Sequence, residues 1–70
     1  MSTLADRLRA ARERAEYTQS DLARLIPCSQ MTVAQWESGN RTINHKDLYR
    51  VCQILDVSSD YLIGLKGERE

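Results

Sequence analysis

The segment from Thr18 to Gly39, TQSDLARLIPCSQMTVAQWESG, constrains the fold most, because a helix stop stands between two helix starts. Thr18 is a favoured N-cap residue, and apolar residues follow it at helical spacing. Pro27 lacks a backbone donor and disfavours the α region for Ile26, so we expect it to end the first helix and to move Ile26 out of that region. Ser29 can cap a second helix, which Gly39 can end. The segment therefore predicts two short helices joined by a tight corner.

The second of these helices has an apolar side and an unusual outward side. Val33 and Trp36 are three residues apart and are expected to face the core. The opposite side carries two amides, a thioether and a methyl group in place of charged groups, and its residues are Gln30, Met31, Ala34 and Gln35. A glutamine presents a donor and an acceptor that match adenine N6 and N7, and Met or Ala can contact a thymine methyl group. The same composition also fits a neutral surface helix without a binding role, and spacing alone does not decide between the two.

The rest of the chain predicts three more helices. Ser2 or Thr3 can cap a first helix that runs to about residue 15, Asn44 can cap a fourth, and Ser58 a short fifth. Apolar residues follow these caps at helical spacing. The inward-facing residues of the first and fourth helices are Leu4, Leu8 and Ala11, then Leu48, Val51, Cys52 and Leu55, and Tyr61, Leu62 and Ile63 crowd the apolar side of the fifth. Seventy residues suffice for one domain, so we expect an all-α, compact five-helix domain over residues 1–66 and a C-terminal tail over 67–70.

The charge of the chain is balanced in total but uneven in distribution. The formal net charge is +0, which by itself does not favour a polyanionic partner. Residues 1–50 carry eight basic and six acidic side chains, and residues 51–70 carry two and four, so the two parts are +2 and −2. Local charge governs the approach to DNA more than the sum does. If the chain binds DNA, we expect modest non-specific affinity and a reliance on base contacts.

Several other classes of function find no support in the sequence. We expect Cys28 and Cys52 to be reduced thiols in the core. His45 is not spaced with either cysteine as zinc ligands are, so we expect no metal site. Apolar runs are too short for a membrane span or signal peptide, which fits a reducing cytoplasm and no membrane partner. No nucleophile–base pair, paired acids or phosphate-binding glycine loop is recognisable. We therefore expect no enzyme activity, no cofactor and no small-molecule ligand.

The motif TQSDLA, followed by the corner and by SQMTVAQWESG, resembles the helix-turn-helix (residues 18–39) of the lambdoid phage Cro and repressor family, and more broadly the XRE-type regulators. The opening MSTLADRLRAARERAEYTQ and the stretch ILDVSSDYLIG are similar to the first helix and the last two helices of that family. The resemblance covers nearly the whole chain, although Pro27 stands where the family usually has glycine. It implies a lambda-repressor-like fold in a sequence-specific regulator of transcription. Such a protein binds a near-palindromic double-stranded DNA operator as a homodimer that forms mainly on DNA. It is most simply a Cro-like phage or prophage repressor.

The resemblance also implies roles for individual residues. Gln30 becomes the first adenine reader, Gln35 reads a second base or a nearby phosphate, and Met31 and Ala34 contact thymine methyl groups. Gln19 touches the DNA backbone and helps to hold Gln30. The expected contacts to the DNA backbone come from Gln19, Ser29, Thr32, Asn40, Arg41, Thr42, Asn44 and Arg12. In the family, an arginine at the position that matches Arg12 forms an ion pair with the acidic residue that matches Glu37. We therefore expect an Arg12–Glu37 ion pair. The family dimerises through its C-terminal region, here Val57, Tyr61, Ile63 and Leu65, although these residues also fit an over-full satellite core.

Other functions suit the same architecture. A prophage repressor, a restriction–modification controller and an antitoxin all remain open. A rival from another class is a protein-interaction module, adaptor-like or antitoxin-like, that kept the fold without its own DNA specificity. The neutral net charge and the absence of Arg and Lys between residues 30 and 38 favour that rival. For a DNA-binding regulator we expect a cytoplasmic, nucleoid-associated location in a bacterial cell or phage-infected host.

Overall fold

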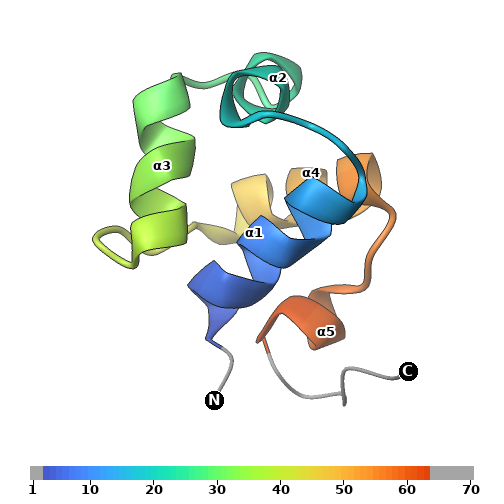
Figure 1. Ribbon diagram of the computed structural model, residues 1–70. Helices are drawn as coiled ribbons and strands as arrows, with labels where there is room; N and C mark the ends of the chain where they lie inside the picture. Colours follow the sequence, from blue (N-terminus) through green and yellow to red (C-terminus); the bar gives the residue numbers. More distant parts are fainter. Residues whose placement is uncertain (1–2, 64–70) are drawn as a thin grey trace.

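A computed structural model of the chain describes residues 3–63, which form five α-helices (Figure 1). These are α1 (Leu4–Arg14), α2 (Gln19–Leu25), α3 (Gln30–Ser38), α4 (His45–Leu55) and α5 (Ser59–Ile63). The predicted all-α, five-helix class is confirmed. The outer limits of the predicted domain and the tail over 67–70 lie outside the described residues. No helix within residues 3–63 is long and apolar enough to cross a bilayer.

The helices begin where local capping chemistry predicted. At α2, the Thr18 side chain accepts a hydrogen bond from the Asp21 amide at 3.0 Å, and the Asp21 carboxylate accepts one from the Thr18 amide at 3.0 Å. These bonds satisfy two amides that the helix itself cannot pair. The bond from the Thr18 amide to the Asp21 carboxylate lowers the pKa of Asp21 below its usual value. Thr3 makes the same pair of bonds with Asp6, whereas the side chains of Ser29 and Asn44 each accept one bond, from the amides of Thr32 and Asp47.

The corner between α2 and α3 corrects one expectation. Ile26 lies in the α region (φ −71°, ψ −31°) although Pro27 follows it, so the prediction that Pro27 displaces it was wrong. The proline clash disfavours this region without forbidding it. Here the α conformation keeps the Ile26 amide bonded to the Leu22 carbonyl at 3.1 Å and keeps the Ile26 side chain fully buried. The Cys28 amide then donates to the Ala23 carbonyl at 2.7 Å and closes the corner. The corner is fully described and has no positive φ, as proline requires.

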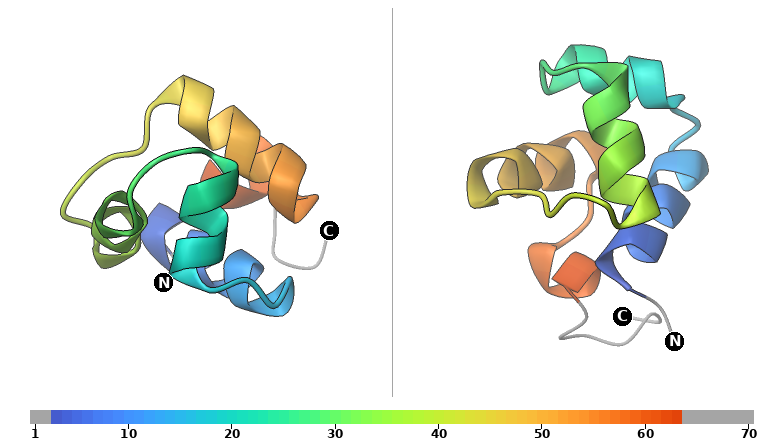
Figure 2. Two further views of the ribbon diagram at one scale, coloured as in Figure 1. Left: turned by 90° about the horizontal axis from the view of Figure 1, so that it is seen from above. Right: turned by 90° about the vertical axis from the view of Figure 1, so that its left-hand side faces the viewer.

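The core places α3 at one side of the molecule with one face uncovered. Every helix contributes to one buried cluster, whose most deeply buried members are Leu8, Leu22, Ile26, Val33, Val51 and Leu62. In the right-hand view of Figure 2, α3 faces the viewer, with α2 above it and α1 and α4 on either side. The described helices therefore hold α3 from behind and leave its outer surface free.

Candidate nucleic-acid interface

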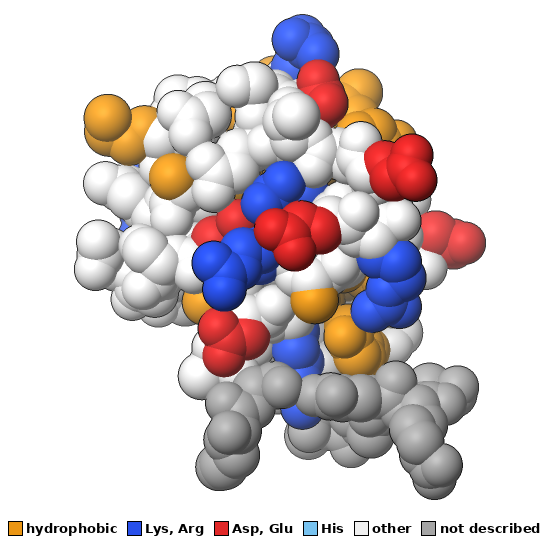
Figure 3. Space-filling view, in the orientation of Figure 1, with side chains coloured by type: hydrophobic (Ala, Val, Ile, Leu, Met, Phe, Trp, Pro, Cys, Tyr) orange, Lys and Arg blue, Asp and Glu red, His pale blue; other side chains and the backbone are white. Residues whose placement is uncertain are grey.

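The outer surface of α3 carries the residues predicted to read bases. Val33 (0% exposed) and Trp36 (4%) fix the inner side of the helix in the core. Gln30 and Met31 are exposed, and Ala34 and Gln35 are half-buried. In Figure 3 the surface over α3 is largely uncharged, whereas basic and acidic groups gather over the neighbouring helices. This neutral side of α3, formed by Gln30, Met31, Ala34 and Gln35, is called the α3 face below.

A buried ion pair joins α1 to the end of α3. The Arg12 Nε donates to Glu37 Oε2 at 2.6 Å, and Arg12 Nη2 donates to Glu37 Oε1 at 3.1 Å. The Arg12 Nη1 donates to the Tyr17 carbonyl at 2.7 Å. The hydrogen bond to Glu37 raises the pKa of Arg12 against the opposing effect of burial. All three guanidinium nitrogens thus have partners within the protein, and the contact of Arg12 with phosphate stays a prediction.

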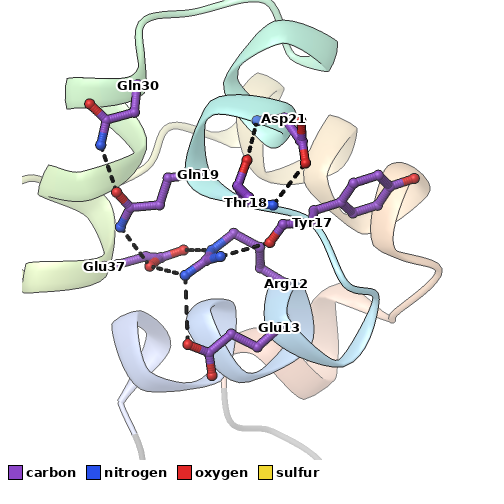
Figure 4. Close-up of polar contacts among 8 residues, drawn as sticks. All are labelled: Arg12, Glu13, Tyr17, Thr18, Gln19, Asp21, Gln30 and Glu37. Carbon is purple, nitrogen blue, oxygen red and sulfur yellow. Dashed lines mark hydrogen bonds and ion pairs between the residues drawn. The ribbon is translucent and has the colours of Figure 1, made fainter.

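Two glutamines extend this pair toward the α3 face (Figure 4). The Gln19 Nε2, at the first residue of α2, donates to Glu37 Oε1 at 3.0 Å. The Gln30 Nε2 donates to Gln19 Oε1 at 2.7 Å. A continuous series of side-chain hydrogen bonds therefore runs from Arg12 in the interior to Gln30 on the surface. The structure thus brings Gln19 against the predicted base reader.

Apart from Arg12 on α1 and Gln19 on α2, the residues predicted to contact the DNA backbone lie around the ends of α3 and at the start of α4. Ser29 and Thr32 form the N-terminal turn of α3, where their hydroxyl groups lie 2.9 Å apart. Asn40, Arg41 and Thr42 are exposed in the loop that follows α3. The amides of residues 40 and 41 both donate to the Gln35 carbonyl, at 3.1 and 3.2 Å. Asn44 caps α4 and is also exposed. These side chains flank the α3 face, and their contacts with DNA stay predictions.

Residues 8–62 match the sequence profile of a helix-turn-helix family. The chain belongs to this helix-turn-helix family. Among similar proteins, the HTH-type transcriptional regulator DicA of Escherichia coli (strain K12) is 30% identical over 61 residues, 87% of this chain and 45% of DicA. Repressor protein C2 of Salmonella phage P22 is 31% identical over 65 residues, 93% of this chain and 29% of C2. The uncharacterized HTH-type transcriptional regulator YqaE of Bacillus subtilis (strain 168) is 34% identical over 64 residues, 91% of this chain and 53% of YqaE. This helix-turn-helix chain spans 29% to 53% of the length of these relatives.

Two solved structures are similar to this helix-turn-helix protein throughout. The crystal structure of the P22 c2 repressor in complex with a synthetic operator has a TM-score of 0.85 and 27% identity, over 90% of this chain and 96% of that one. The solution structure of the DNA-binding domain of the same repressor also has a TM-score of 0.85, with 29% identity over 99% and 88% of the two chains. These matches confirm the predicted lambda-repressor-like fold and the resemblance to the phage repressor family.

The residues predicted to form a dimer interface differ in exposure in this helix-turn-helix protein. Ile63 is 49% exposed at the end of α5. Val57 and Tyr61 are partly buried against the core. The Tyr61 ring lies 5.6 Å from the Arg7 guanidinium, and its carbonyl accepts a hydrogen bond from Arg7 Nη1 at 3.0 Å. Leu65 lies outside the described residues. Ile63 is therefore the described member of the set that offers the most apolar surface to a partner.

The sequence did not reveal two polar contacts that position the helix-turn-helix. No local sequence pattern indicates the Gln19–Glu37 hydrogen bond, because it joins the first residue of α2 to the last turn of α3. The Arg50 Nη1 donates to the Ile26 carbonyl at 2.6 Å and so ties α4 to the corner. A basic residue three positions after Asp47 is an ordinary surface pattern, and nothing local names a carbonyl 24 residues away as its partner.

Proposed function

We propose that this protein is a sequence-specific, double-stranded DNA-binding regulator of transcription that reads bases with the α3 face, acting as a Cro-like repressor of phage or prophage origin. The observation that carries the proposal is the uncharged, amide-bearing surface of α3, which is exposed while Val33 and Trp36 hold the helix from behind. A glutamine amide offers the donor and acceptor that adenine requires in the major groove. The names of DicA and C2 as regulator and repressor, and the operator bound by the P22 protein, support the same function.

The residues around α3 suit contacts with phosphate. Gln19 and Ser29 stand at helix N-termini, where free amides favour an anion. Thr32 on α3 and Asn40 and Thr42 in the loop after it offer neutral hydrogen-bond donors beside the α3 face. Arg41 adds a charged group in that loop. Asn44 caps α4, whose N-terminal amides also favour an anion. We assign these residues to positioning on the backbone rather than to base recognition.

The proposal includes a homodimer, formed mainly on DNA, that acts on a near-palindromic operator. A two-fold pair of such domains requires half-site centres about 34 Å apart, one turn of the double helix. Exposed Ile63 supports a contact between the subunits. The protein so described is a cytoplasmic, nucleoid-associated regulator in a bacterial cell or infected host. It needs no cofactor, membrane or small-molecule ligand, and we assign it no catalytic role.

One observation favours a second candidate function. The α3 helix contains no Arg or Lys, and the whole chain has a formal net charge of +0. These features suit an adaptor-like or antitoxin-like helical module that binds a protein instead of DNA. Salt separates the two functions, because each phosphate neutralised by the protein releases counterions and makes DNA affinity fall steeply with ionic strength.

Selection of random duplexes with the purified protein tests the proposal directly. We expect enriched sequences with two-fold symmetry and half-sites about one helical turn apart. The double variant Gln30→Ala, Gln35→Ala should lose this enrichment, because it removes both amides from the α3 face. Gln53→Ala is a matched control, since Gln53 is an exposed glutamine on α4. Absence of enrichment with the wild-type protein would refute the proposed function and favour the adaptor.

A further inference from the structure

The hydrogen-bond series that ends at Gln30 begins at a group that can only accept. The Glu37 carboxylate accepts from two nitrogens of Arg12 and from Gln19 Nε2. Because an ionised carboxylate has no proton to donate, Gln19 must turn its NH₂ group toward Glu37. The Gln19 Oε1 then faces away from Glu37 and can only accept, so Gln30 must turn its own NH₂ group toward it. Figure 4 shows both amides in this order.

We propose that the Arg12–Glu37 ion pair, acting through Gln19, fixes the order of donor and acceptor that Gln30 presents and so selects adenine over guanine at one base pair. The inference deepens the proposed function and rests on it, because it assumes that Gln30 meets a base edge. Glu37 and Gln19 are positioning residues in this scheme. Neither needs to touch the base that it helps to select.

The two orientations of the Gln30 amide suit different purines. With one N–H bonded to Gln19, Gln30 keeps a second N–H and its Oε1 for DNA. Adenine offers the N7 acceptor and the N6 donor, which match that pair. Guanine offers two acceptors, N7 and O6, so the Gln30 oxygen would face the guanine O6. A reversed Gln30 would instead present both of its hydrogens, and these would suit guanine.

The protein resists this reversal at its buried end. Rotating Gln30 alone would set its Oε1 against Gln19 Oε1, which are two acceptors. Rotating Gln19 as well would move the mismatch to Gln19 Oε1 and the Glu37 carboxylate. Glu37 cannot relieve that mismatch, because its side chain is only 3% exposed and both of its oxygens are held by Arg12. A buried acceptor facing an acceptor loses its hydrogen bond without gaining water in its place.

Two substitutions of Gln19 test the inference on the full chain. Gln19→Glu keeps an acceptor toward Gln30 but loses the donor to Glu37, whereas Gln19→Lys offers only donors and still pairs with Glu37. The affinity of each protein is measured for two duplexes of the selected site. The duplexes differ only by A·T or G·C at the base pair whose preference is lost in Gln30→Ala. The ratio of the two affinities reports base choice, because the added charges change binding to both duplexes alike.

The wild-type protein should prefer adenine by about 5- to 150-fold, the range of one good bidentate contact. Gln19→Glu should keep most of this ratio while binding both duplexes more weakly. Gln19→Lys should lower the ratio to about one or invert it toward guanine, and Gln19→Met, which neither donates nor accepts here, should fall between the two. In all variants the ratio at the base pair that depends on Gln35 should be unchanged, which excludes general loosening of α3.

The outcomes separate this inference from the proposed function. If no base preference of the wild-type protein depends on Gln30, the proposed reading of DNA fails. If adenine preference depends on Gln30 but Gln19→Glu and Gln19→Lys have equal ratios, the proposed function stands and the inference is overturned. A wild-type preference for a base other than adenine at that position also overturns it. Circular dichroism confirms that each variant is folded. If only one of Gln19→Lys and Gln19→Met folds, its affinity ratio compared with that of the wild type still tests the inference.

Discussion

Arg12 and Glu37 bring two charges into the interior of a small helical protein. Each residue is 8% exposed, and within residues 3–63 they are the buried polar or charged residues of the core. A buried charge is costly unless it is paired and hydrogen-bonded, and this pair shares two bonds while Arg12 makes a third to the Tyr17 carbonyl. The pair thereby links the fold of α1 to the position of α3.

Removal of one partner should therefore destabilise the protein strongly. In Arg12→Met the Glu37 carboxylate stays buried with only Gln19 to donate to it, and the expected loss is about 3–5 kcal/mol of unfolding free energy. The double variant Arg12→Met, Glu37→Leu should recover much of this loss, because no buried charge remains. Urea unfolding measures both. Arg9→Met, at an exposed arginine of the same helix, should leave the midpoint nearly unchanged. A loss below about 1 kcal/mol in Arg12→Met, the range of exposed pairs, would contradict this account.

At the scale of the element, α3 depends on how its two ends are fixed. Its C-terminal end is Gly39, which has φ +85° and is the C-cap. A methyl group at that position would meet no atom within 4 Å, so the requirement for glycine is conformational and not steric. The conformation also lets the next two amides bond to the Gln35 carbonyl, which orients the loop that carries Arg41.

Gly39→Ala should lower the unfolding free energy by about 1–2 kcal/mol, the cost of the left-handed region for a residue with a Cβ atom. Gly39→Asn should lose less, because asparagine tolerates this region better. Thermal unfolding of both variants distinguishes this explanation from crowding, which would make the larger asparagine worse. An unchanged melting temperature in Gly39→Ala would show that the chain relaxes at this cap.

The N-terminal end of α3 depends on the corner that Arg50 holds from α4. Arg50→Met removes the donor to the Ile26 carbonyl but keeps most of the aliphatic length of the side chain. We expect a loss of about 1 kcal/mol, since Arg50 is exposed and water can replace part of the bond. Hydrogen exchange of the Cys28 amide, which closes the same corner, should become faster. Lys46→Met on the same helix is the control, and equal exchange in both variants would dismiss a role for Arg50.

The helices could be predicted from the sequence because their signals are local. Thr18 and Ser29 cap helices through residues three positions away, and apolar spacing identifies the buried side of each helix. The conformation of Ile26 was predicted wrongly. The proline that follows it disfavours the α region, but burial of the Ile26 side chain and the bond from its amide to the Leu22 carbonyl stabilise that conformation. In the candidate site, the outward side of α3 followed from spacing, and the expected Arg12 partner came from the family resemblance.

The remaining contacts could not be predicted, because no pattern along the chain encodes them. Arg50 bonds to a carbonyl 24 residues away, and Arg7 bonds to the Tyr61 carbonyl 54 residues away. The Gln19–Glu37 bond spans 18 residues and joins two helices whose relative position depends on the corner. Such contacts appear only once the tertiary structure fixes which helix ends meet.

For the whole molecule, charge and size limit what one subunit can achieve on DNA. The chain has a formal net charge of +0, and α3 contributes no basic side chain. Electrostatic attraction to phosphate supplies most non-specific affinity, so a single subunit should bind weakly. In the proposed homodimer, a second subunit on the adjacent half-site would make the second binding event intramolecular and raise affinity without any new kind of contact. The proposed function therefore depends on a contact between the two subunits.

Ile63 is the residue at which this dependence can be measured. It is 49% exposed on α5, and Ile63→Asp would place two like charges near each other across a two-fold axis. We expect at least tenfold weaker binding to an operator with two half-sites, and a much smaller change on a duplex with one half-site. Leu25→Asp adds the same charge at a 52% exposed leucine on α2 and controls for the effect of charge alone. Electrophoretic mobility shifts on the two duplexes measure both. Equal losses on one and two half-sites would place the subunit contact elsewhere.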